Sequence, residues 1–201
     1  MTLHRKRESF HAKWRFPVAA SVHAGCGRAG YDYIRLVDHV VGIAMEAHPE
    51  LPPTPYTSKS EFQEVFTFMA YLSAVTLKIG FITGVLGLPQ RQTALVAKQA
   101  AQVDCMSNGR LILGVGIGYN AVESGAMGEH FKTRGARVEE QIAVLRALWT
   151  RPIVSFEGKW HQLDHVNVNP LPVQRPIPIC MGAGRPAGAP AQGDRADRQL
   201  C

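Results

Sequence analysis

The chain has few cysteines and no long apolar run, and both absences narrow its class. Its 201 residues include four cysteines, which are widely separated and form no C-x-x-C pair. That spacing argues against a zinc ribbon or a disulfide framework and favours a reducing, cytoplasmic location. No apolar stretch approaches the length that spans a bilayer, and charged residues interrupt the short one near the amino terminus that would otherwise suggest a signal peptide. We therefore expect no membrane partner.

A basic face is also missing from the main body of the chain. The formal net charge is +6, yet residues 1–30 hold six Lys or Arg against one acid, whereas residues 31–184 hold thirteen of each sign. A nucleic-acid-binding surface needs its basic residues on the folded part of the chain, so we expect no nucleic-acid partner. The hydrophobic fraction of 46% and the charged fraction of 19% are those of a globular protein with a substantial core.

What the sequence does contain is an alternation of strand-like and helix-like segments. Short apolar runs predict strands at 33–37, 77–83, 111–113 and 177–181. Apolar residues at helical spacing predict helices from residue 61, over 92–107 and over 133–149. A proline-rich loop over 42–60 and an excursion over 153–176 interrupt the pattern, while residues 1–30 and 185–201 carry no period and are expected to be poorly ordered.

This alternation predicts an α/β fold with a parallel sheet, whose ligand face lies at the carboxyl ends of the strands. It suits a partial (β/α)8 TIM barrel over residues 31–184, because four strands are too few to close such a barrel. Ser60 is the expected N-cap of the first helix. Asn108 and Gly109 are expected to end the second helix in the left-handed conformation.

A glycine ladder follows the third predicted strand. Gly114, Gly116 and Gly118 remove side chains where that strand is expected to end, so the backbone there can approach a flat or phosphorylated ligand. Asn120 and Glu123 are the first polar side chains beyond it that can direct such a ligand. The other interpretation is a loop whose glycines only let the chain turn, and these residues alone leave both open. A dinucleotide fingerprint is disfavoured, since it needs glycine at position 119 and a helix that opens promptly.

Histidines supply the remaining candidates. His39 follows Asp38 at the end of the first predicted strand, and histidine is the side chain best suited to exchange a proton near neutral pH. A strand-end histidine is usually structural, so both roles stay open. His161 and His165 have the spacing of metal ligands on a helix, but their segment is not expected to be helical and no third ligand is evident. We interpret them as ordinary surface histidines and predict no metal site.

Several motifs, taken together, resemble the luciferase-like monooxygenase superfamily and, within it, the oxidoreductases that use the deazaflavin coenzyme F420. Their order and spacing extend over about three quarters of the chain. They are G-Y-D-Y-I-R-L-V-D-H at 30–39, L-K-I-G-F-I-T-G-V at 77–85, A-K-Q-A-A-Q-V-D-C-M-S-N-G-R-L at 97–111, G-V-G-I-G-Y-N-A-V-E at 114–123, F-K-T-R-G-A-R-V-E-E-Q at 131–141, L-R-A-L-W at 145–149, F-E-G at 156–158 and P-L-P-V-Q-R-P-I-P-I at 170–179.

The resemblance implies a bacterial-luciferase-like barrel segment, about strands 2 to 5, with a flavin or deazaflavin across the carboxyl ends of its strands. Asp38 and His39 would lie beside the cofactor ring, with His39 as proton relay or ring contact. One face of the ring would press against the backbone of Thr83, Gly84 and Val85. The remaining implied contacts, to the ring edge, the cofactor chain or its phosphate, are Gly116, Gly118, Asn120, Glu123 and Gly182.

The implied activity is hydride transfer or monooxygenation of a small organic substrate with coenzyme F420. An FMN-dependent monooxygenase is the alternative, because flavin reacts with oxygen and deazaflavin does not. Ile117 stands where branches that oxidise sugar phosphates tend to have an acid, which disfavours that branch. The resemblance does not name the substrate, since specificity in the family lies largely in loops that vary.

The chain departs from the family pattern at both ends. Residues 1–30 lack its G-I-x-x-P-type strand, and residues 185–201 lack its Ser-led helix. We hypothesise that both ends are out-of-frame or truncated translation, which reading the encoding DNA in its other frames would test. On this hypothesis the product is an inactive fragment that associates or aggregates, or a homo-oligomer, because half a barrel exposes its sheet edges and inner face.

Overall fold

The computed structural model describes residues 31–182. The sequence-based predictions for residues 1–30 and 185–201 lie outside this range. Within it, the prediction of a parallel α/β fold is confirmed, and the elements follow the predicted alternation of strands and helices.

The centre of the described chain is a parallel sheet. Strand β1 (Tyr33–Leu36) pairs with β2 (Gly80–Thr83), β2 pairs with β4 (Leu111–Gly116), and β4 pairs on its other side with β7 (Ile179–Met181). The short β3 (Leu86–Gly87) pairs with the carboxyl end of β4. All of these pairs are parallel, so the carboxyl ends of the strands gather at one edge of the sheet.

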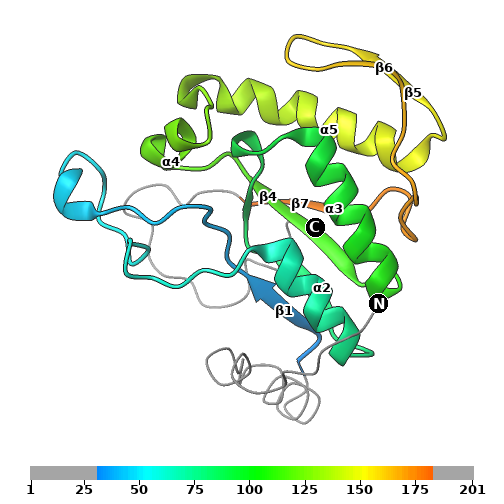
Figure 1. Ribbon diagram of the computed structural model, residues 1–201, viewed down its shortest axis with the longest axis horizontal. Coiled ribbons are helices and arrows are strands. Elements are labelled where there is room, and N and C mark those ends of the chain that lie inside the picture. The colour runs from blue at the N-terminus through cyan, green and yellow to red at the C-terminus, as the bar shows by residue number, and fades with distance from the viewer. Residues whose placement is uncertain (1–30, 183–201) are drawn as a thin grey trace, which may run out of the picture.

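Three helices cover one face of this sheet (Figure 1). Helices α2 (Val65–Val75), α3 (Thr93–Ser107) and α5 (Arg134–Thr150) lie side by side, with α3 between the other two. Alternate strand residues such as Phe81, Leu111 and Leu113 point into the core beneath the helices and are fully buried. The other set includes Tyr33 and Arg35, which are exposed. A sheet with helices on one face and a bare inner face is what a segment of a (β/α)8 barrel requires.

The ends of α3 and α2 give one confirmed prediction and one correction. Asn108 and Gly109 take the left-handed conformation, with φ of 57° and 76°, and end α3 as predicted. Ser60 is not the N-cap of α2. Glu64 caps this helix instead, because its carboxylate accepts the Thr67 amide at 2.7 Å.

The second predicted strand is also shorter and more complex than expected. Leu77 is 90% exposed and β2 begins only at Gly80. After a break at Gly84 and Val85, Leu86 and Gly87 return to the sheet as β3.

Two elements were absent from the sequence-based prediction. Helix α4 (Ala121–Ala126) opens directly after the glycine ladder, so the expectation that no helix begins there is wrong. The excursion over 153–176 contains an antiparallel hairpin of β5 (Val154–Glu157) and β6 (Gln162–Val166), which extends away from the sheet (Figure 1). Single turns of 3-10 helix occur at Met45–Ala47, Leu88–Gln90 and Phe131–Thr133.

Two further properties bear on the sequence-based predictions. Among residues 31–182, no helix has the length and apolar character needed to cross a bilayer. Among the described cysteines, Cys105 is a free thiol and Cys180 is disulfide-bonded.

Candidate functional site

A bulge interrupts the second strand at the ligand edge of the sheet. Phe81 of β2 pairs with Leu111 of β4, and Leu86 of β3 pairs with Val115. The chain therefore advances five residues on the β2–β3 side for four on β4, which is the definition of a β-bulge. The extra residue falls at Gly84–Val85, where the peptide bond is cis.

The ladder glycines make room for this bulge. A Cβ atom at Gly114 would lie 2.0 Å from the Thr83 carbonyl oxygen, and one at Gly116 would lie 2.7 Å from Cγ2 of Val85. A Cβ atom at Gly182, directly after the neighbouring strand β7, would lie 2.6 Å from Cγ1 of Val85. Gly114, Gly116 and Gly182 thus form a bed for Val85 and its backbone. Gly114 and Gly116 also lie within β4 rather than beyond it, which corrects the predicted strand end.

The bed leaves the Val85 side chain partly in solvent. This side chain is 38% exposed, although Gly116 and Gly182 contact it from below. Thr83 fixes the start of the bulge, because its buried hydroxyl donates to the Gly114 carbonyl at 2.6 Å. From the sequence we expected the backbone of the glycine ladder to approach a ligand. In the structure the chain's own bulge lies on the ladder, with Val85 above it, and a contact of Gly116, Gly118 or Gly182 with a cofactor remains a prediction.

His39 and Glu123 meet beside the bulge. Nδ1 of His39 lies 3.2 Å from Oε2 of Glu123, although 84 residues separate the two in sequence. The Val40 amide donates to the other carboxylate oxygen at 2.8 Å, and the Gln90 amide approaches Oε2 at 3.5 Å. Glu123 is only 2% exposed. The end of β1 is therefore tied to the first turn of α4 by a buried carboxylate.

The hydrogen bonds to Glu123 keep it ionised. Burial by itself raises the pKa of the Glu123 carboxyl, but hydrogen bonds from His39 and from the Val40 amide outweigh burial, and the net pKa lies below its ordinary value. Asn120 places this side chain, since its amide oxygen accepts the amides of Val122 and Glu123 as the N-cap of α4. The predicted contact of Asn120 with a cofactor remains a prediction.

Asp38 is held by Arg91. Its carboxylate accepts two hydrogen bonds from the guanidinium, at 2.6 and 3.3 Å, and one from the Gly87 amide at 3.3 Å. Arg91 also reaches Glu64 at the start of α2, at 3.4 Å. Asp38 thus fixes the end of β1 against the segment that follows β3, and its direct contact with a cofactor remains a prediction.

Aromatic rings surround His39 on its outer side. The ring centres of Tyr56 and Phe62 lie 5.0 and 4.9 Å from that of His39, and the ring centre of Tyr119 lies 6.1 Å away. The Tyr119 hydroxyl bonds the Thr54 hydroxyl at 3.0 Å, which ties the proline-rich loop to the end of the glycine ladder. The loop over 42–60 therefore contributes a wall of the site, as long loops in compact domains often do.

These groups line a cavity of about 200 Å³ at the carboxyl ends of the strands. The cavity brings together six of the predicted site residues, namely Asp38, His39, Gly84, Val85, Gly118 and Glu123. Thr83, Gly116, Asn120 and Gly182 do not line it. Sequence reasoning missed Tyr56, Gln90 and Tyr119, which also line it. Tyr119 stood within the ladder motif, whereas nothing local to Tyr56 or Gln90 indicated a site.

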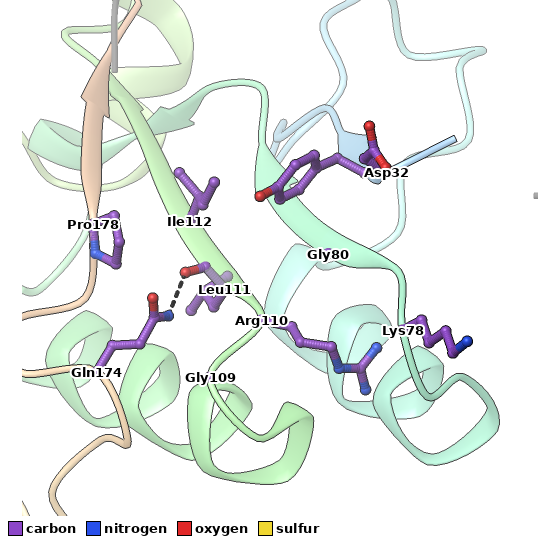
Figure 2. A pocket seen from close by; sticks show the side chains of 10 residues that line it. Asp32, Lys78, Gly80, Gly109, Arg110, Leu111, Ile112, Gln174 and Pro178 are labelled. Atoms are coloured by element: carbon purple, nitrogen blue, oxygen red, sulfur yellow. Dashed lines mark hydrogen bonds between the residues drawn. The ribbon is translucent and has the colours of Figure 1, made fainter. Parts of the chain in front are cut away.

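A larger hollow, of about 570 Å³, lies at the amino ends of the strands (Figure 2). Asp32, Lys78 and Arg110 are among its residues. The Arg110 guanidinium is already used there, because it donates to the carbonyls of Ser107 and Ile79 at 2.6 Å each. Ligands of parallel α/β sheets bind at the carboxyl ends of the strands. We therefore assign the functional site to the smaller cavity.

The remaining histidines do not form a site. His161 is not the surface histidine that the sequence suggested, since Glu140 contacts its Nδ1 at 2.8 Å and Thr93 its Nε2 at 2.6 Å. His165 is exposed and contacts its neighbour Asp164. Among residues 31–182, no three His, Cys, Asp or Glu side chains gather in a way that would hold a metal ion.

The described residues fit one side of a flat ring. Val85 offers exposed apolar surface on a raised backbone, and the cavity beside it contains the His39–Glu123 pair. The cavity is smaller than the 300–1,000 Å³ or so that ligand pockets usually have, so the described residues line only part of a pocket of that size. No lysine or arginine lines the cavity among the described residues, so its lining offers no cation for a phosphate group.

Comparison with known sequences agrees with this arrangement. A family model described as luciferase-like monooxygenase matches residues 25–201. Over 186 residues the chain is 34% identical to an uncharacterized protein of Mycobacterium tuberculosis. The aligned segment covers 90% of this chain and 62% of that protein. The chain is 38% identical over 111 residues to the F420-dependent glucose-6-phosphate dehydrogenase of Amycolatopsis mediterranei, which covers 54% of this chain and 33% of that enzyme. The chain thus spans only part of the length of these relatives.

Solved structures share the fold of the described sheet and helices. The monooxygenase RslO1 from Streptomyces bottropensis superimposes with a TM-score of 0.63 at 26% identity, over 77% of this chain and 43% of that one. An F420-dependent secondary alcohol dehydrogenase superimposes with a TM-score of 0.64 at 22% identity, over 80% of this chain and 46% of that one. A third structure is the oxygenating constituent of 3,6-diketocamphane monooxygenase from Pseudomonas putida in complex with FMN. It superimposes with a TM-score of 0.63 at 18% identity, over 82% of this chain and 44% of that one. The last two likenesses concern the fold alone.

A barrel-segment sheet, a site at its carboxyl edge and a family match over most of the chain agree with one another, and the protein belongs to the luciferase-like monooxygenase family.

Proposed function

We propose that the protein acts as an F420-dependent oxidoreductase, in the cytoplasm, on a small organic substrate. The bulge at Thr83–Val85 carries the proposal. It lifts an exposed apolar side chain over a bed of glycines at the ligand edge of the sheet, beside a histidine and a buried carboxylate. An apolar platform next to a proton-exchanging group suits a redox ring whose chemistry involves both a hydride and a proton.

The protein's own contribution is to bind, orient and exchange a proton. Val85 and the backbone of Gly84 would support one face of the ring, and the rings of Tyr56 and Tyr119 would exclude water from the neighbourhood of His39. His39 would hold or release the proton that accompanies the redox step. The ring, when bound, supplies or accepts the hydride.

The described cavity favours a neutral substrate. It has no lysine or arginine in its lining, and Arg91 nearby is already paired with Asp38. Ile117, where branches that oxidise sugar phosphates tend to have an acid, points the same way. We therefore propose a neutral alcohol, carbonyl compound or similar small molecule rather than a sugar phosphate, although a relative in the family is named for glucose 6-phosphate.

Cofactor titration tests this function. Coenzyme F420 and FMN are added separately to the purified full-length chain, and binding is followed by absorbance. We expect saturable binding of F420, as the name of the Amycolatopsis relative supports. Tight binding of FMN without binding of F420 would favour the alternative, an FMN-dependent monooxygenase. Absence of binding by either would overturn the proposal.

Two glycine variants sharpen the titration. In Gly116→Ala the new Cβ atom would lie 2.7 Å from Val85 and displace it, so we expect the affinity for F420 to fall. A tenfold loss corresponds to about 1.4 kcal/mol. Gly135→Ala is the matched control, because a Cβ atom there meets nothing within 4 Å. Equal affinities for the two variants would mean that the bed does not support the ring.

We also propose that the chain associates with itself. No described strand pairs with the outer edge of β1 or of β7, and Tyr33 on the inner face is 54% exposed. Free strand edges and exposed inner-face side chains favour association. Size-exclusion chromatography with circular dichroism is expected to show an oligomer or aggregate. A compact monomer that unfolds cooperatively would count against this, and against the alternative of an inactive, aggregating fragment.

A further inference from the structure

Glu123 is a buried charge without a cationic residue beside it. It is 2% exposed, and His39 is the one ionic partner that it has among the described residues. Asp38, by contrast, is paired with the permanently charged Arg91. A buried carboxylate is costly unless hydrogen bonds and opposite charge compensate it. Glu123 is compensated by the amides of Val40 and Gln90 and by His39, and His39 is the one of these partners that can also exchange a proton.

The contact determines which nitrogen of His39 is free. An ionised carboxylate only accepts hydrogen bonds, so Nδ1 of His39 must donate its proton to Oε2 of Glu123. In the neutral ring, Nε2 is then the acceptor, and no described residue forms a hydrogen bond with it. His39 lines the cavity beside Val85, and its Nε2 is the ring nitrogen left for a ligand.

We propose that Glu123 is the positioning residue of His39, and that Nε2 of His39 is the atom that gives or takes the proton at the redox site. This inference rests on the proposed function for the proton step, and it changes the role of Glu123 from a cofactor contact to a group that orients the histidine. The carboxylate fixes the neutral tautomer and favours the imidazolium once Nε2 is protonated.

The groups that face His39 leave Glu123 as the dominant charge. Glu123 approaches from α4, Tyr56 from the proline-rich loop and Tyr119 from the end of the ladder. The two phenols are neutral near pH 7. The neighbouring Asp38–Arg91 pair carries opposite charges that largely cancel. Glu123 is therefore the charged group whose removal tests the arrangement around His39.

A second Glu–His pair in the same chain serves as a control. Glu140 contacts Nδ1 of His161 at 2.8 Å, but Nε2 of His161 is taken by the buried Thr93 hydroxyl at 2.6 Å. Both ring nitrogens of His161 are used, so this pair fastens the β5–β6 hairpin to α3 and α5. The two pairs have the same residue types and differ in whether Nε2 is free.

The test compares wild type, Glu123→Gln and Glu140→Gln in the full chain without cofactor. Long-range ¹H–¹⁵N spectra report which imidazole nitrogen carries the proton. We expect the neutral His39 of the wild type to be protonated at Nδ1, and this preference and the pH midpoint of its signals to change in E123Q. E140Q should change only His161. A wild-type His39 protonated at Nε2, or unchanged His39 signals in E123Q, would overturn the inference. The wild-type spectrum decides even if E123Q does not fold.

A kinetic arm separates this inference from the proposed function. With F420 and a reactive substrate, E123Q should lower kcat about 10- to 100-fold and alter the pH profile, with the affinity for F420 unchanged. If the protein binds F420 and E123Q keeps the wild-type kcat and pH profile, the positioning role fails while the proposed function stands. If F420 does not bind, the proposed function fails, and the spectra still decide the orientation of His39.

Discussion

The bed beneath the bulge gives a direct test of how the site is built. In Gly114→Ala the added Cβ atom would lie 2.0 Å from the Thr83 carbonyl oxygen, which is a backbone atom and cannot rotate away. Either β4 or the bulge must therefore shift. Such a shift also threatens the 2.6 Å hydrogen bond from the Thr83 hydroxyl to the Gly114 carbonyl.

The expected loss of stability follows from these two contacts. Overfilling a packed site costs about 1–3 kcal/mol. Losing a buried hydrogen bond adds about 1 kcal/mol. Together they lower the free energy of unfolding by about 2–4 kcal/mol, and this would move the midpoint of urea unfolding down by about 1–2 M. The assay is urea unfolding followed by fluorescence, since Trp149 is fully buried and reports loss of the core.

Gly135→Ala is the control for this experiment. Its Cβ atom meets no neighbour within 4 Å, and the position lies in α5, where alanine is the better helix former. We expect its midpoint to equal or exceed that of the wild type. If Gly114→Ala unfolded at the same urea concentration as Gly135→Ala, the bulge would not rest on β4 as described, and the reasoning about the ladder would be refuted.

Three further predictions concern the supports of the site. Asn120→Ala removes the N-cap of α4, so stability should fall by about 0.5–2 kcal/mol in urea unfolding, with Asn120→Ser losing less. Arg110→Met should lower the thermal midpoint by several degrees, because the carbonyls of Ser107, Thr76 and Ile79 lose their donor. An unchanged thermal midpoint in this variant would contradict the prediction. The hairpin should loosen in acid. Burial raises the pKa of Glu140, but hydrogen bonds from His161 and three backbone amides outweigh it, and the net pKa is lowered. The stabilisation by Glu140 is therefore present above the ordinary carboxyl pKa and is lost as pH falls through the lower folded-state value. We expect faster amide exchange at residues 159–161 below about pH 4. Unchanged exchange there would contradict this.

The elements that the sequence predicted well carry their own local signals. Helix α3 has a regular apolar face and ends in Asn108–Gly109, whose left-handed conformation needs no distant partner. Strand β4 begins as an apolar run buried on the helix side. The parallel order of the sheet followed from the alternation of such elements. Local pattern and local chemistry agree at these positions.

The features that escaped prediction depend on residues far apart in the sequence. The start of α2 was misplaced because Phe62, which fits the helical spacing, lies outside the helix and packs on the His39 ring. The bulge depends on Gly114, Gly116 and Gly182 lying beneath Val85, which no local pattern reveals. Of these missed features, only α4 had a local sequence signal. Asn120 is followed three residues later by Glu123, which is the pattern of a helix start.

Separation in the sequence also explains why the contacts within the site were not predicted. His39 and Glu123 were both candidates, but their contact across 84 residues, and hence the orienting role of the carboxylate, is visible only in the fold. The pairing of Asp38 with Arg91, 53 residues away, is likewise visible only in the fold, and the contact of Asp38 with a cofactor ring stays a prediction. The sequence named six of the residues that line this cavity, and their contacts with one another depend on the fold.

A redox ring bound on Val85 at the carboxyl edge of the sheet would change the surroundings of the Val85 methyl groups. The most direct test follows the methyl resonances of Val85 while coenzyme F420 is added to the full chain, with backbone signals of Asp32 and Lys78 in the larger hollow as reference (Figure 2). We expect large, saturable shifts of the Val85 methyl groups and of His39, and none at the reference residues. Shifts confined to the larger hollow, or saturable binding that leaves Val85 unmoved, would contradict this expectation.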